Sequence, residues 1–174
     1  MGDLNTVLPA LLSELVNGSP DPSIGTFMLN RGDRGLLYAL DQISAEGAST
    51  TATGGATIAA HTDHVRYGLE LLNRWASGET SPWKTADWTA SWRKQVVTND
   101  EWHRLRADLR READTWQRHL ATIGELSDTA MKWVAGSVAH LAYHLGAIRQ
   151  IDRATRGPTA EDERGVSLAS PHQG

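Results

Sequence analysis

Hydrophobic positions recur every three or four residues through most of the chain, which is the spacing of one face of an α-helix. The pattern predicts helices at residues 4–16, 22–44, about 57–75, about 99–123 and about 128–153. In the second of these, glycines interrupt the first half, so the pattern is strong only from Gly35 to Ser44. No alternation of apolar and polar positions indicates a β-strand.

Capping residues mark several helix starts. Thr98 and Glu101 have the spacing of a capping box, in which each side chain bonds to the backbone N–H of the other residue. Ser127 can cap the last helix, and Asp21 followed by Pro22 is a signal that opens the second. These signals predict helix starts near residues 22, 99 and 128.

Together the five stretches predict an all-α fold, an antiparallel four-helix bundle with an extra short helix at the N-terminus. We expect one domain over residues 1–155 and a flexible C-terminal tail over 156–174, because the tail is rich in Pro, Gly, Ser and charge. Hydrophobic residues make up 40% and charged residues 22% of the chain, a balance that argues for a folded globule and against disorder.

Composition disfavours several classes of function. The formal net charge of -4 argues against a general nucleic-acid binder, which usually needs a strongly positive surface. No apolar run approaches the roughly 20 residues of a membrane helix and no signal peptide opens the chain, so we expect a cytoplasmic protein with no membrane partner. The absence of cysteine excludes disulfides, thiolate metal sites and a cysteine nucleophile.

Four of the seven histidines form two pairs at helical spacing. His61 and His64 are three residues apart, and His140 and His144 are four apart, so each pair lies on one helix face. Both pairs flank the apolar stripes of their helices and are expected to face the interior. Neutral imidazoles buried without partners are costly, and a shared metal ion would offset that cost. A single interior histidine is more often satisfied by a carbonyl or a water, which leaves a plain helical domain without metal as the alternative.

Two stretches of the chain resemble a known family. Residues 139–150, AHLAYHLGAIRQ, resemble the last-helix signature of the DinB-like (DNA-damage-inducible) superfamily, which includes bacillithiol-dependent transferases and is similar to mycothiol-dependent isomerases. Residues 57–64, TIAAHTDH, resemble the segment that carries the first metal ligand of that family. The resemblance covers roughly residues 30–153. It implies a four-helix bundle, often homodimeric, with a three-histidine metal site.

Carried over to this chain, the ligands implied by the resemblance are His64, His140 and His144. His64 is preferred to His61 because of its distance from Thr57, the residue that opens the helix. His61 is left with three roles: an alternative ligand, a support for a ligand, or a general base. Imidazole ligands suit several divalent ions; zinc or nickel is expected first, with iron and others open. Asp63 could orient a ligand imidazole or be a solvated surface residue.

The resemblance implies a metal-dependent enzyme that transfers a low-molecular-weight thiol to an electrophile. Because the chain has no cysteine, such a thiol would arrive with the small-molecule substrate. Metal-assisted hydrolysis would use the same site, and a non-catalytic helical binding domain stapled by a metal is the alternative. Trp83, Trp88 and Trp92 could wall a pocket over the metal or plug one end of the bundle; the plug is favoured.

Overall fold

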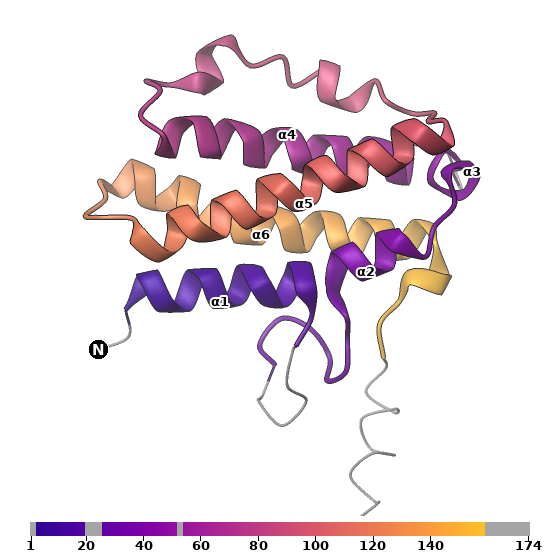
Figure 1. Ribbon diagram of the computed structural model, residues 1–174, viewed down its shortest axis with the longest axis horizontal. Helices are drawn as coiled ribbons and strands as arrows, with labels where there is room; N and C mark the ends of the chain where they lie inside the picture. The colour runs from indigo at the N-terminus through magenta and orange to yellow at the C-terminus, as the bar shows by residue number, and fades with distance from the viewer. Residues whose placement is uncertain (1–2, 20–25, 52–53, 159–174) are drawn as a thin grey trace, which may run out of the picture.

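The computed structural model describes residues 3–19, 26–51 and 54–158 of the chain. Its described part is all-α and contains no strand (Figure 1). The long helices are α1 (Leu4–Asn17), α4 (Ile58–Ala76), α5 (Asn99–Thr122) and α6 (Asp128–Ile151). The short ones are α2 (Gly35–Asp41), α3 (Ala45–Ala48) and the 3-10 turns η1 (Pro82–Thr85), η2 (Ala90–Trp92) and η3 (Arg153–Thr155). Among these helices, none has both the length and the hydropathy needed to cross a bilayer.

Four of the five predicted helices match α1, α4, α5 and α6 to within two residues at each end. The predictions for the first two helices need correction: α1 is one of the four long helices, not an extra short one, and the second stretch yields only the 7-residue α2. The expected start at Asp21 and Pro22 lies outside the described residues. The described part also ends at residue 158, so most of the predicted C-terminal tail lies beyond it.

The buried carboxylate of Glu14 explains why the segment before α2 is irregular. Its two oxygens accept hydrogen bonds from three consecutive backbone N–H groups, those of Phe27, Met28 and Leu29. Those N–H groups bond to a side chain on α1, and the segment is not helical. The hydrophobic pattern alone carries no sign of this contact.

The ends of the long helices follow the expected capping chemistry. The Thr98 hydroxyl oxygen accepts the N–H of Glu101 at 3.3 Å, and the Glu101 carboxylate accepts the N–H of Thr98 at 2.8 Å. This confirms the predicted capping box at the start of α5. Ser127 caps α6 by accepting the N–H of Ala130. Such caps satisfy backbone donors that a helix start otherwise leaves unbonded.

The long connection between α4 and α5, residues 77–98, sets the direction of the helices, and we call it the crossover segment. It returns to the start of α4, where the Thr57 N–H and hydroxyl donate to Gln95 at 3.0 and 2.9 Å. Further along, Asn73 of α4 bonds to Glu112 of α5. Helices α4 and α5 are therefore parallel, and Figure 1 shows the crossover segment running above both.

Helix α6 runs antiparallel to α4. His61 near the start of α4 contacts His144 late in α6, whereas Trp75 at the end of α4 contacts Trp133 early in α6. The expected antiparallel packing is thus found between α4 and α6, whereas α4 and α5 are parallel. The short connection after α5 turns the chain back into α6, and α1 packs against both α5 and α6.

The core lies where the four long helices face one another. Trp102 and Trp116 are almost fully buried, as their positions on the apolar stripe predict. Trp116 also donates its indole N–H to Ser137 at 2.9 Å, and Ser137 donates to the Val134 carbonyl at 2.6 Å. This satisfied polar contact joins α5 to α6 within an otherwise apolar interface.

Candidate metal centre

Three imidazoles from two helices converge in the interior. His64 of α4 and His140 and His144 of α6 present ring nitrogens that all lie within 4.8 Å of one another. The Nε2 atom of His140 lies 3.2 Å from Nε2 of His64 and 3.0 Å from Nε2 of His144. Tetrahedral ligation with metal–nitrogen bonds of about 2.0–2.1 Å needs nitrogens about 3.3 Å apart. The residues therefore fit a divalent ion, and they are the three the sequence predicts.

Ser91 determines which nitrogen of His64 carries the proton. The Ser91 hydroxyl donates to the Trp88 carbonyl at 2.7 Å, so it can only accept from His64 Nδ1, which lies 2.8 Å away. In a neutral imidazole the proton is then on Nδ1 and the lone pair is on Nε2. Nε2 is the nitrogen that faces the other two histidines. Ser91 thus prepares His64 as a ligand.

His61 contacts the outer nitrogen of His144. Their Nδ1 atoms are 2.9 Å apart, so one of them carries the shared proton. If Nε2 of His144 is the ligand atom, its Nδ1 keeps the proton and donates it to His61. Of the three roles left open for His61, this contact supports the one in which it holds a ligand in place.

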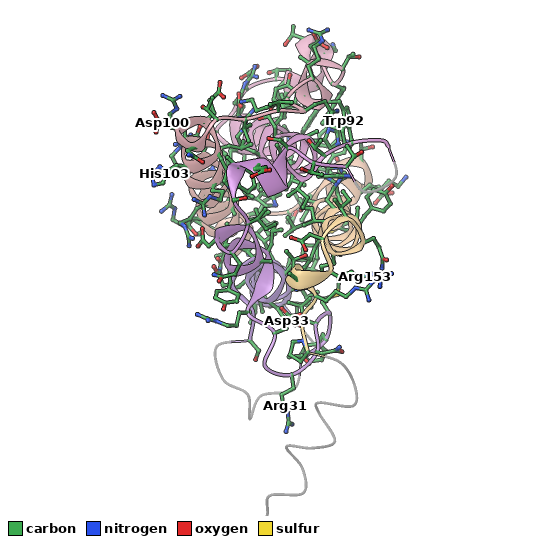
Figure 2. All side chains as sticks on the ribbon, turned by 90° about the vertical axis from the view of Figure 1, so that its right-hand side faces the viewer. Arg31, Asp33, Trp92, Asp100, His103 and Arg153 are labelled. Carbon is green, nitrogen blue, oxygen red and sulfur yellow. The ribbon has the colours of Figure 1, made fainter. Side chains whose placement is uncertain are left out.

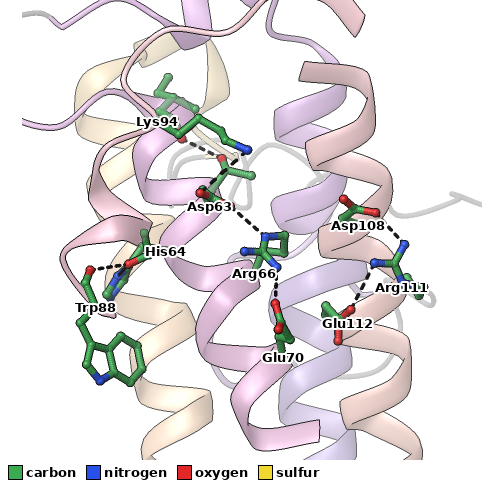
Figure 3. A network of polar contacts seen from close by, with 12 residues as sticks. Asp63, His64, Arg66, Glu70, Trp88, Lys94, Asp108, Arg111 and Glu112 are labelled. Carbon is green, nitrogen blue, oxygen red and sulfur yellow. Dashed lines mark hydrogen bonds and ion pairs between the residues drawn. The ribbon is translucent and has the colours of Figure 1, made fainter. Parts of the chain in front are cut away.

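Asp63 does not take the role considered for it. Its carboxylate is buried, but it bonds to Arg66 at 2.8 Å and lies 4.0 Å from Lys94. Arg66 extends this chain of charges to Glu70 at 2.6 Å. Figure 3 shows these ion pairs on one side of α4 and His64 with Trp88 on the other. Asp63 is therefore neither the partner of a ligand nor a freely solvated surface group.

Burial keeps the cluster neutral. Removal from water, reinforced by the nearby His140 and His61, lowers the pKa of His64 to about 4 and that of His144 to about 3. Burial also lowers the pKa of His61 and of His140. All four rings are then uncharged at neutral pH, which is the state that metal ligation requires.

Tryptophans from the crossover segment cover the histidines. The Trp92 ring stacks on His64 with centroids 4.2 Å apart and 24° between the planes, and it meets His61 edge-on at 5.3 Å. Trp88 contacts His64 from another direction, with centroids 5.6 Å apart. Both rings lie over the cluster and not at the end of the bundle, and Trp88 is also a wall of the cavity next to it, whereas Trp92 only covers the histidines.

A cavity of about 300 Å³ adjoins the cluster at His140. Trp83 and Trp88 of the crossover segment and Trp133 of α6 line it, together with aliphatic side chains of α4 and α6. Trp83 also packs against Trp133 with centroids 4.5 Å apart, at the end of the α4–α6 interface. The prediction that the tryptophans plug one end of the bundle therefore holds only in part for Trp83, because the same ring is also a wall of the cavity.

The other histidines do not join the cluster. His103 is exposed on the outer face of α5, and Figure 2 shows it on the opposite side of the molecule from Trp92. His119 contacts the ring of Trp116, and His172 lies outside the described residues. Sequence reasoning missed Ser91, because a single serine in an irregular connection gives no periodic signal.

The chain was also compared with known proteins. No protein-family model matches it, and neither a curated protein nor a solved structure does.

Proposed function

We propose that the chain is a divalent-metal-dependent enzyme of the DinB-like type, with His64, His140 and His144 as the ligands of zinc or nickel. The observation that carries the proposal is the convergence of three Nε2 atoms from α4 and α6 at ligand spacing. When bound, the ion would lower the pKa of a thiol or a water, so that a nucleophile forms near neutral pH. Three protein ligands leave a coordination position open for it.

The chain's own residues prepare this site. Ser91 and His61 keep protons on the outer nitrogens of His64 and His144, and Trp92 shields His64 from water. The cavity at His140 offers space for a small substrate next to the ligands. Since the chain has no cysteine, a thiol nucleophile belongs to the substrate. In the transfer its sulfur forms a bond to the electrophile, the leaving group departs with its electron pair, and the thiol proton goes to solvent.

The resemblance of residues 139–150 to the DinB-like signature supports the same assignment, since both α6 ligands lie within it. We further propose that the four long helices correspond to the bundle of that family and that the chain forms a homodimer.

Elemental analysis of protein purified without an affinity tag tests the proposal. We expect one divalent ion per chain, lost in His64→Ala, His140→Ala and His144→Ala but retained with lower affinity in His61→Ala. Activity is then sought with low-molecular-weight thiols and 1-chloro-2,4-dinitrobenzene, whose displaced chloride and new thioether are both measurable. Full transfer activity in metal-free protein would overturn the proposal.

A non-catalytic metal staple is the other function considered for this site. It predicts a closed shell in which His61 is a fourth ligand. The Nδ1 atom of His61 instead faces Nδ1 of His144, on the other side of that ring from the ligand nitrogen. The geometry therefore favours the open site of an enzyme.

A further inference from the structure

The cavity at His140 has walls unlike those of a site for a small hydrophilic molecule. Three tryptophan rings and several aliphatic side chains line it, and its exposed surface is mostly apolar. A ring lying against such walls gains both apolar burial and aromatic contact. The walls therefore select for a flat apolar group.

The cavity is partly open to solvent, so its volume sets the size of the part of a ligand that it can surround. A cavity of about 150 Å³ is enough to hold benzene. At about 300 Å³, this cavity has room for one substituted ring or two fused rings. A bulky peptide or a nucleotide would not be enclosed by it.

One charged side chain lies at the cavity. Among the described residues that line it, Lys132 of α6 is the only one with a formal charge, and it is exposed. His140, at the metal cluster, is another lining residue and stays neutral because burial lowers its pKa. An anionic substituent would be attracted to Lys132 while its ring occupies the apolar space.

We propose that this cavity binds an aromatic anion, such as an aromatic carboxylate, with its ring between the tryptophans and its charged group at Lys132. His140 lines the cavity and is also one of the three proposed metal ligands, so the aromatic anion would be the substrate of the enzyme. This last step rests on the proposed function. The binding itself depends only on the cavity.

Gly136 offers a way to fill the cavity without disturbing the core. It lines the cavity, and a Cβ built on it meets no atom within 4 Å. Gly146 is a matched control: it also lies in α6, is also exposed and also has open space, but it does not line the cavity. Replacing a helical glycine by leucine favours the helix in both variants, so both are expected to fold.

Isothermal titration calorimetry with 2-naphthoate tests the proposal, using the protein as purified and recording its metal content. We expect binding to the wild type and to Gly146→Leu, and at least about tenfold weaker binding to Gly136→Leu. Naphthoate is expected to bind about two- to fivefold more tightly than neutral 2-naphthamide, and Lys132→Met should remove that preference. Acetate, which has the charge without the ring, should give no measurable heat.

Two results would overturn the proposal: no binding of naphthoate by the wild type, or equal binding by Gly136→Leu and Gly146→Leu. If the wild type holds its metal ion but does not bind naphthoate, this inference alone is refuted and the proposed enzyme stands. The opposite outcome is a protein that holds no metal but binds naphthoate, with the binding blocked by Gly136→Leu. That result would refute the proposed enzyme and leave the aromatic-anion site standing.

Discussion

The two ends of the α4–α6 interface are built from different chemistry. At one end His61 and His64 of α4 meet His144 of α6 in a buried polar cluster. At the other end Trp75 of α4 packs edge-on against Trp133 of α6, with centroids 5.4 Å apart. The same pair of helices thus carries imidazoles at one end and indoles at the other.

This contrast shows how the molecule can tolerate a costly site. Each buried imidazole nitrogen loses bonds to water and must be matched by a specific partner such as Ser91. At the other end most of the stabilisation comes from apolar ring area removed from water, although a buried indole N–H still needs an acceptor, as Trp116 has in Ser137. Stability and metal chemistry should therefore respond to mutation at different ends.

The strongest response to mutation is predicted at the histidine end. His144→Ala should reduce bound metal from one equivalent to none, because two nitrogens cannot hold the ion as three do. It should also abolish the stabilisation by added zinc, about 2.7 kcal/mol at a hundredfold excess over Kd. Metal analysis and thermal unfolding measure both, with His103→Ala on the exposed face of α5 as the control. Full metal content in His144→Ala would contradict the ligand set.

The next effect belongs to the tryptophan end. Trp116→Ala should lower the free energy of unfolding by about 3–5 kcal/mol, since this fully buried ring packs near Trp75 and bonds to Ser137. Trp133→Ala, at a half-buried position, should cost less. Urea denaturation gives both values. A Trp116→Ala protein that still folds should bind metal with unchanged affinity, and a large loss of affinity would mean that the two ends are not separable.

A smaller effect is expected from the hydroxyl that holds His64. Ser91→Ala removes the acceptor of the Nδ1 proton and should weaken metal affinity about 10- to 100-fold without changing the stoichiometry. Ser137→Ala is the matched control, because it removes another buried serine hydroxyl, one that bonds to Trp116 and not to a ligand histidine. Competition with a chelator of known affinity measures the change. Equal affinity in the two variants would remove Ser91 from the site.

Acid should destabilise the metal-free protein. In the unfolded chain the pKa of histidine returns to about 6.5, whereas burial holds the folded values near 4 for His64 and 3 for His144. Between these limits the unfolded state binds more protons, so stability should fall as the pH drops from 6.5 toward 4 and stay level above 6.5. Urea titrations at several pH values, repeated with His144→Gln, should show a shallower slope in the variant.

The long helices and the two histidine pairs could be predicted from the sequence. The apolar stripe of α6 and the spacing of His140 and His144 indicate a buried pair, and the capping box locates the start of α5. These features depend on residues close together in the chain, so the local pattern contains them.

Contacts between distant segments could not be predicted in the same way. The parallel course of α4 and α5 depends on where the crossover segment returns, which no periodicity indicates. The three N–H bonds of Glu14 and the covering of His64 by Trp92 join residues 13 or more positions apart. Each arises from tertiary packing and leaves no trace in a short window of sequence.

The crossover segment supplies none of the three proposed ligands, yet it supplies Ser91 and Trp92, which touch His64 directly. The residues that cover His64 are thus encoded in a different stretch of the sequence from the proposed ligands. A protein engineer could vary Ser91 and Trp92 and so retune the reactivity of the proposed ion, while Gln95 continues to hold the start of α4 and the ligand-bearing helices stay as they are.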